Sequence, residues 1–164
     1  MKKTLILAAF AAADAIVLGG CASLRMTPEE KAAMEAAVQD DLDNRTYVID
    51  VDQMIPRRGI SKHVTNYSLE VKEDKLISHL PYFGQAWNLP YGGGKGMNFE
   101  SEISEYIETV TKPDRRQITI VTNNGEDTFV FVLQVFTNGK TDIDVRSRNR
   151  EPIGYYGNMR TLEP

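Results

Sequence analysis

Apolar and polar side chains alternate along most of the chain after residue 45, with the two-residue period of half-buried β-strands. Val, Ile, Thr and aromatic residues, which strands favour, dominate these stretches. The alternation predicts strands over residues 47–51, 67–71, 76–80, 103–111, 117–122, 128–136 and 142–146. Residues 128–136 are apolar on both faces, which indicates a strand buried on both sides in a central position.

Turn sequences separate the predicted strands at the spacing of β-hairpins. Asn124-Gly125 and Asn138-Gly139 provide residues that tolerate the positive φ of tight turns. Polar runs at 72–75 and 112–114 end two other strands. Links this short join antiparallel neighbours, because parallel strands need a long crossover. The expected fold class is therefore mainly β, an antiparallel meander of about seven to eight strands. A curled sheet, an open barrel and a sandwich all fit.

One helix is predicted ahead of the strands, over residues 28–43. Thr27 is a favoured N-cap, Pro28 suits the first helical position, and Glu30 stands where a capping box requires an acid. Val38 and Leu42 belong to a modest apolar stripe at helical spacing. We expect this N-terminal helix to pack on a face of the sheet, where it would cover the central strand.

The start of the chain has the pattern of a processing segment. Lys2 and Lys3 precede a predominantly apolar stretch, residues 5–18, which is shorter than the roughly 20 residues that a membrane-spanning helix needs. Asp14 places a charge inside this stretch and weakens the pattern. A cleaved signal peptide is favoured over a permanent span.

The apolar stretch ends in Leu18-Gly19-Gly20-Cys21, which resembles the lipobox of bacterial lipoproteins. That resemblance implies that Cys21 carries a lipid and becomes the new N-terminus. The predicted organisation is a signal peptide at 1–20, a tether at 21–27 and a single β-rich domain at 28–164. Cys21 is the only cysteine, so an internal disulfide is excluded.

Charge narrows the range of partners. Removing residues 1–20 takes away Lys2, Lys3 and Asp14, so 17 basic and 22 acidic residues remain, a net charge of −5. Phosphate backbones demand clustered Lys and Arg, so nucleic acid is not expected as a partner. Attachment to a membrane is expected through the lipid on Cys21, on the periplasmic face of the envelope. The absence of an acidic run after Cys21 favours this periplasmic side, and the outer membrane is expected rather than the inner one.

Several short motifs are specific enough to compare with a known family. They include Tyr67-Ser68-Leu69, Leu80-Pro81-Tyr82-Phe83-Gly84, Pro90-Tyr91-Gly92-Gly93, Val135-Phe136-Thr137-Asn138-Gly139, Asn149-Arg150-Glu151-Pro152-Ile153 and Tyr156-Gly157. With these motifs the chain, from about Thr46 to Gly157, resembles the domain-of-unknown-function family 4251 of small exported proteins from Bacteroidetes. The resemblance implies an exported single-domain protein, and it supplies no catalytic residues.

The segment from Leu80 to Met97 is the candidate site. It concentrates aromatic side chains and then a glycine-rich run, which would let a loop close over a ligand. The predicted ligand- or partner-binding residues are Tyr82, Phe83, Trp87, Tyr91 and Arg150. In the alternative interpretation, Tyr82 and Phe83 only plug one end of the β core.

No motif indicates a catalytic site, a metal site or a cofactor. Lys95 is followed by Gly96 rather than Ser or Thr, so the phosphate-binding loop pattern fails. His63 and His79 lack zinc-ligand spacing, and their nearness to Ser61 and Ser78 in sequence does not make a triad. Acids at 40, 41, 43, 50 and 52 lack the calcium-loop pattern, and Arg146, Arg148 and Arg150 recur at strand period on one face.

The expected function is that of a lipid-anchored, non-enzymatic binding or interaction module, with an envelope protein or a small molecule as its partner. The missing catalytic set and the exported address motivate this expectation. A barrel-like carrier of an apolar small molecule is the main alternative. A hydrolase that uses His63 or His79 and a structural envelope protein without a small ligand are two further alternatives.

Overall fold

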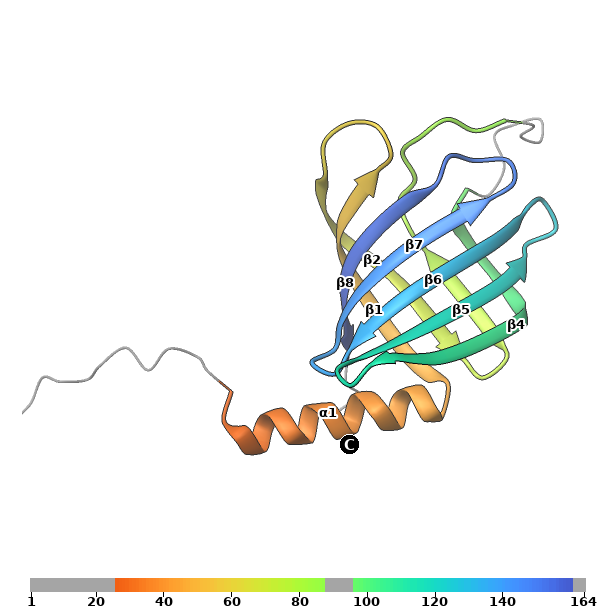
Figure 1. Cartoon of the computed structure of the whole chain (residues 1–164). Coiled ribbons are helices and arrows are strands. Elements are labelled where there is room, and N and C mark those ends of the chain that lie inside the picture. Colours follow the sequence, from red (N-terminus) through yellow and green to blue (C-terminus); the bar gives the residue numbers. More distant parts are fainter. Residues whose placement is uncertain (1–25, 88–95, 161–164) are drawn as a thin grey trace, which may run out of the picture.

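Eight antiparallel strands close into a barrel in the computed structural model, which describes residues 26–87 and 96–160 (Figure 1). The strands are β1 (Thr46–Pro56), β2 (Lys62–Lys72), β3 (Lys75–His79), β4 (Asn98–Lys112), β5 (Arg115–Asn123), β6 (Thr128–Phe136), β7 (Lys140–Ser147) and β8 (Ile153–Arg160). Each strand pairs with the next in sequence, and β8 pairs back with β1. The mainly β, antiparallel fold is confirmed, and the sheet closes completely.

All the strands expected from the alternation are present, and β8 is the strand that the pattern missed. In β8 the apolar residues alternate with Gly154, Tyr156 and Asn158, and Gly157 takes one of the inward positions. Two glycines in a strand weaken its hydrophobic signal. Gly157 is required by packing, because a Cβ there would overlap the carbonyl oxygen of Asp50 in β1 and lie 3.0 Å from Ile49 Cγ2.

The inward side chains of all eight strands fill the barrel. Those fully buried include Tyr47, Ile49, Leu69, Val71, Leu76, Ile118, Ile120, Phe129, Phe131, Leu133 and Tyr155. Phe99 stacks on Phe129 with ring centroids 4.8 Å apart. An eight-stranded barrel is just wide enough for its side chains to fill. The structure therefore has a packed interior rather than an obvious lumen.

The expectation that residues 128–136 form a central strand covered by the helix is wrong. In β6, Phe129, Phe131 and Leu133 point into the barrel, while Val130 and Val132 lie partly exposed on the outer surface. A closed barrel has no central strand, because every strand has two neighbours and one outward face.

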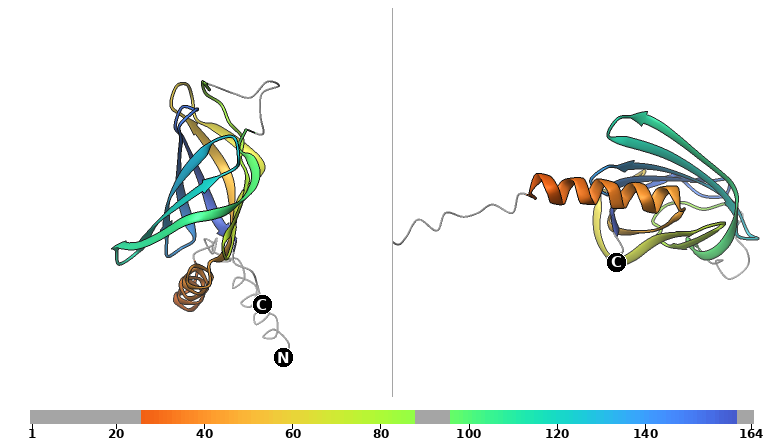
Figure 2. Two further views of the ribbon diagram at one scale, coloured as in Figure 1. Left: turned by 90° about the vertical axis from the view of Figure 1, so that its right-hand side faces the viewer. Right: turned by 90° about the horizontal axis from the view of Figure 1, so that it is seen from below.

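Helix α1 (Pro28–Asp43) has the bounds and the capping box expected from the sequence. The Thr27 hydroxyl accepts from the N–H of Glu30, and a Glu30 carboxylate oxygen accepts from the N–H of Thr27 at 2.7 Å. The helix lies across one open end of the barrel, and only Val38 and Leu42 are buried (Figure 2). Among the residues that the structure describes, no helix is long and apolar enough to cross a membrane.

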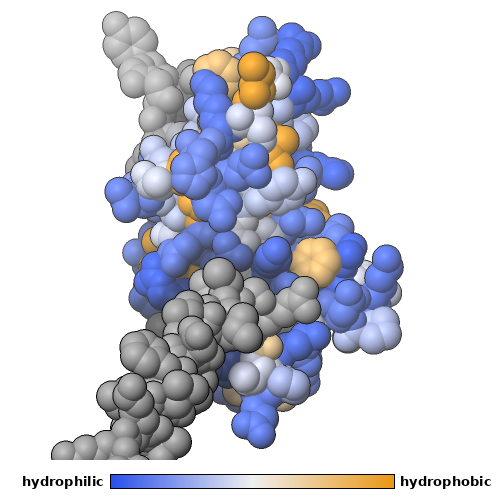
Figure 3. Space-filling view, turned by 90° about the vertical axis from the view of Figure 1, so that its left-hand side faces the viewer, coloured by the Kyte–Doolittle hydropathy of each residue, from blue (hydrophilic) through white to orange (hydrophobic). Residues whose placement is uncertain are grey.

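The barrel has two different ends. The helix end carries α1 and the short β2–β3, β4–β5 and β6–β7 turns. The loop end carries the longer connections 57–61, 80–97 and 148–152, together with 124–127. On the face drawn in Figure 3 the surface is mostly hydrophilic, and several of its apolar residues gather toward the upper, loop end. The candidate site lies at the loop end.

Candidate functional site

The chain after β3 is fastened across the loop end. Leu80 is buried, and the hydroxyl of Tyr155 donates to the carbonyl oxygen of Pro81 at 2.6 Å. Further along, Ala86 pairs with Arg150 in an antiparallel bridge. The N–H of Glu151 donates to Gln85 O (2.9 Å), and the N–H of Trp87 donates to Asn149 O (2.7 Å). Residues 85–87 therefore form a short antiparallel pair with residues 149–151.

Tyr82 and Arg150, far apart in sequence, meet at this pair. The hydroxyl of Tyr82 donates to Gln85 O at 2.7 Å and also lies 3.3 Å from Glu151 O. Burial raises the pKa of Tyr82 above its usual value. The guanidinium carbon of Arg150 is 5.5 Å from the centroid of the Tyr82 ring, within range of a cation–π interaction. Arg150 is only 5% exposed, and its buried Nε has no hydrogen-bond partner.

Two aromatic side chains of the same segment are turned outward. Phe83 is 53% exposed and Trp87 is 50% exposed. Lys62, at the start of β2, places its ammonium nitrogen 4.3 Å from the centroid of the Phe83 ring. Ile60 in the β1–β2 loop is also exposed. We call Ile60, Lys62, Phe83 and Trp87, together with the half-buried Tyr82 and the buried Arg150 that contacts its ring, the loop-end surface. Its exposed part combines apolar contact area with the positive charge of Lys62.

Two buried carboxylates hold the loops beneath this surface, and neither was predicted from the sequence as a site residue. Asp127 accepts from the N–H of Thr128 (2.8 Å) and from the N–H of Asn149 (3.2 Å). Glu151 accepts from the N–H of Gln85 (3.2 Å), and the Arg58 Nε lies 3.5 Å from its other oxygen. Hydrogen bonds of this kind satisfy buried carboxylates that would otherwise be costly. Their only sequence signal is that Glu151 lies in a motif shared with the resembling family.

The structure brings four of the five predicted site residues to the same end of the barrel. Tyr82 and Arg150 are in contact range, with Phe83 and Trp87 on the same segment as Tyr82. Tyr82 is half-buried, so it both supports the segment and borders its surface. Tyr91 and the glycines at 92–94 lie outside the described residues, and so does Cys21.

The side chains considered above as catalytic, metal-binding or anion-binding candidates make other contacts. Ser78 is buried and donates to Met97 O at 2.7 Å, while His79 is exposed and stacks on Tyr67 with centroids 5.3 Å apart. Within residues 26–87 and 96–160 no group of three or more His, Cys, Asp or Glu side chains could hold a metal ion. Arg146 does not share a face with Arg150, because Arg146 is exposed in β7 and pairs with Asp144 (2.7 Å).

The acids considered as a calcium cluster are dispersed into separate contacts. Asp43 pairs with Arg116 at 2.8 Å, Asp50 pairs with Arg160, and Asp52 accepts from Asn158 Nδ2 at 3.1 Å. The Asp41 carboxyl has a raised pKa, caused first by burial and then by its neighbour Asp40.

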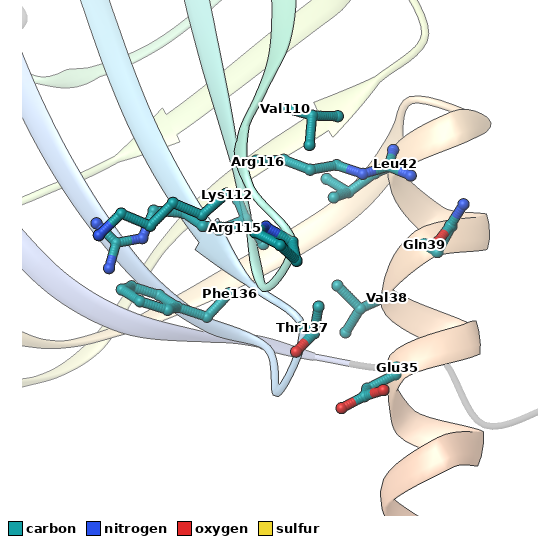
Figure 4. A pocket seen from close by; sticks show the side chains of 12 residues that line it. Glu35, Val38, Gln39, Leu42, Val110, Lys112, Arg115, Arg116, Phe136 and Thr137 are labelled. Atoms are coloured by element: carbon teal, nitrogen blue, oxygen red, sulfur yellow. The ribbon is translucent and has the colours of Figure 1, made fainter.

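Two hollows lie outside the barrel wall. One, of about 190 Å³, separates α1 from the β4–β5 hairpin and the β6–β7 turn. Val38 and Leu42 of the helix face Val110 and Arg116 of the hairpin across it (Figure 4). The other, of about 300 Å³, lies along β1, β7 and β8 around Tyr156. Neither includes a residue of the loop-end surface.

Comparison with known proteins identifies the fold and the family. No curated protein matches the chain. A crystal structure of a DUF4251 family protein from Bacteroides eggerthii DSM 20697 superposes with a TM-score of 0.61 at 14% identity, covering 80% of this chain and 91% of the other. At that identity the likeness establishes the fold alone. Residues 29–159 match the family described as "Domain of unknown function (DUF4251)". The resemblance expected from the short motifs is confirmed, and the chain belongs to the DUF4251 family.

Proposed function

We propose that this protein is a lipid-anchored, non-enzymatic binding module of the bacterial envelope, and that the loop-end surface recognises its partner. The observation that carries the proposal is the exposure of Phe83 and Trp87 on a segment whose backbone is fixed to residues 149–151. Binding hot spots are enriched in aromatic and arginine side chains, and a rigid backbone reduces the entropy lost on binding.

The position of helix α1 supports the same proposal. Helix α1 begins at Pro28 and lies at the helix end, opposite the loop-end surface. A lipid on Cys21, if attached as the lipobox pattern predicts, would fasten the protein through the tether that precedes α1. The loop-end surface would then project away from the membrane, where it can meet a partner.

A carrier role is the second candidate, since the barrel fold is compatible with it. The filled interior favours a binding site on the surface over one inside the barrel. Phe129, Phe131 and Tyr155 occupy the interior space that a ligand would need. The hydroxyl of Ser78 donates to Met97 O and His79 stacks on Tyr67, and these contacts support a non-enzymatic role over a hydrolase. A purely structural envelope protein would bind proteins without holding a small molecule.

The proposal is tested by capturing partners on the full chain and on surface variants. Immobilised full chain is incubated with envelope extract, and bound proteins and small molecules are identified. Trp87→Ala and Phe83→Ala should each lower recovery of a specific partner at least about tenfold, as expected for a hot-spot truncation. Tyr156→Ala is the matched control, because Tyr156 is a similarly exposed aromatic on the barrel wall.

The outcomes separate the alternatives. Loss of one partner with the loop-end variants and its retention with Tyr156→Ala would support the binding module. A tightly held apolar molecule that survives all three variants would favour the carrier. Capture that does not respond to Trp87→Ala or Phe83→Ala would contradict the assigned surface.

A further inference from the structure

The one buried arginine among the described residues has no acidic partner. Arg150 is 5% exposed, and within residues 26–87 and 96–160 no Asp or Glu forms an ion pair with it. More exposed arginines do contact carboxylates: Arg58 contacts Glu151, Arg116 contacts Asp43 and Glu108, Arg146 contacts Asp144, and Arg160 contacts Asp50. An arginine cannot lose its proton to avoid the cost of burial, so a buried guanidinium without a counter-charge is unfavourable.

The acids closest to Arg150 in the loop-end connections are bound to other groups. Asp127 accepts from two backbone N–H groups. Glu151 accepts from one backbone N–H, and its other carboxylate oxygen lies 3.5 Å from Arg58 Nε. The sequence of residues 88–95 contains neither Asp nor Glu. The counter-charge for Arg150 is therefore expected to come from another molecule.

The loop end also has hydrogen-bond donors that no described residue uses. All three guanidinium nitrogens of Arg150 lack a partner in the described part of the chain. Only Nε among them is enclosed, so the two terminal nitrogens remain open to a ligand. Asn124 Nδ2 and Ser147 Oγ are likewise enclosed without a partner, and both can donate. Unused donors together with an unpaired positive charge favour a ligand with negatively charged acceptor oxygens.

We propose that Arg150 binds a carboxylate carried on an apolar group of the ligand, an inference that rests on the function proposed above for the loop-end surface. The planar guanidinium matches a carboxylate with two parallel hydrogen bonds. One unpaired positive charge balances one negative charge, so a carboxylate fits better than a doubly charged sulfate or phosphate. The ring of Tyr82 beside the guanidinium and the exposed Phe83 and Trp87 supply apolar contact for the rest of the group. The carboxylate belongs either to a protein or to a small organic acid.

Benzoate and its neutral isostere benzamide test this assignment by calorimetric titration of the full chain in detergent solution. Benzoate should bind at least about tenfold more tightly than benzamide, because only benzoate forms charge-assisted hydrogen bonds, and sulfate should bind more weakly than benzoate. Arg150→Met should remove the preference for benzoate. Arg150→Lys, which keeps the charge but not the planar fork, should leave an intermediate preference. Arg148→Met is the matched control, because Arg148 is an exposed arginine two residues away, and it should retain the full preference.

Equal binding of benzoate and benzamide, sulfate binding as tight as that of benzoate, or a benzoate preference that survives Arg150→Met would overturn the inference. The function proposed above would still stand if capture of a partner depends on Phe83 and Trp87. Conversely, a benzoate preference that depends on Arg150, together with capture that does not respond to Trp87→Ala, would support the carboxylate site and contradict the larger surface. Displacement of a captured protein by benzoate would assign the carboxylate to a protein. Recovery of an organic acid without a protein would assign it to a small molecule.

Discussion

The two ends of the barrel are closed by different interactions. At the helix end, Val38 and Leu42 bury apolar surface against the rim, and the connecting turns are short. At the loop end, buried Asp127 and Glu151 accept hydrogen bonds from backbone N–H groups of longer connections. Apolar burial depends on area and tolerates small shifts, whereas hydrogen bonds depend on direction. The difference suggests that the helix end contributes stability and the loop end fixes the shape of a surface.

The largest loss of stability is expected in the wall that joins both ends. Gly157→Val would push a side chain into the Asp50 carbonyl of the neighbouring strand, where even a Cβ has no room. Overpacking of a well-packed site costs about 1–3 kcal/mol and occasionally more, and a backbone atom cannot yield as a side chain can. We expect the free energy of unfolding, measured by urea denaturation, to fall by at least about 3 kcal/mol.

Gly154→Ala is the control for this prediction. Gly154 lies in the same strand, but the nearest atoms to a Cβ there are 3.6–3.8 Å away, an ordinary contact distance. We expect a change of less than about 1 kcal/mol. Similar losses from both substitutions would mean that glycine is needed in β8 for a reason other than the close approach to β1.

At the helix end, Leu42→Ala should separate α1 from the barrel. Leu42 is fully buried, and truncating a buried leucine typically costs about 2–4 kcal/mol. Gln39→Ala, on the exposed side of the helix, should cost less than about 0.5 kcal/mol. Hydrogen exchange should show faster exchange in α1 and little change in residues 85–87. Equal acceleration at both ends would contradict their separate closure.

Most of the fold is predictable from the sequence because its signals are local. The capping box at Thr27 and Glu30 fixed the start of α1, and the alternation in residues such as 128–136 located strands. Closure of the sheet was not predictable, because the pairing of β1 with β8 joins residues far apart in sequence. The position of α1 was missed for the same reason, since amphipathicity shows that a face is buried but not against what.

The sequence located the segment that carries the candidate site, but it did not show which of its side chains are exposed. Aromatic density identified Tyr82, Phe83 and Trp87, and their exposure or burial depends on contacts with residues 149–151. Asp127 and Glu151 carried no chemical pattern of their own, since an acid in a turn is ordinarily solvated.

One buried tyrosine near each end of the barrel makes the stability of the protein depend on pH. Burial raises the pKa of Tyr155, near the loop end, and of Tyr47, near the helix end, well above the usual value of 10.0. Below pH 10 both states hold the proton, so these groups do not change stability with pH. Above pH 10 the unfolded chain ionises first, so stability falls as pH rises.

Tyr155→Phe and Tyr47→Phe should each flatten this alkaline fall, measured by urea denaturation between about pH 9 and 11. At neutral pH, Tyr155→Phe should cost about 1–2 kcal/mol, because the carbonyl oxygen of Pro81 loses its 2.6 Å hydrogen bond. The hydroxyl of Tyr47 lies 3.3 Å from the hydroxyl of Tyr106, which is a longer and weaker hydrogen bond. Tyr47→Phe should therefore lower the free energy of unfolding less than Tyr155→Phe does. An unchanged alkaline profile in both variants would show that other groups set it.

The smallest effects should come from one arginine at each end. Arg116 at the helix end is 20% exposed in its side chain and lies 2.8 Å from Asp43 and 2.6 Å from Glu108. Arg58 at the loop end is 73% exposed and lies 3.5 Å from Glu151, which keeps its bond from the Gln85 N–H without it. Arg116→Gln should therefore cost about 1 kcal/mol, and Arg58→Gln less than about 0.5 kcal/mol. Urea denaturation at low and high salt measures both, and salt should lower the cost of Arg58→Gln proportionally more than that of Arg116→Gln, because it screens the more exposed charge pair more strongly. A larger cost for Arg58→Gln would mean that the loop end depends on this ion pair, and that its backbone hydrogen bonds do not suffice to hold the surface in place.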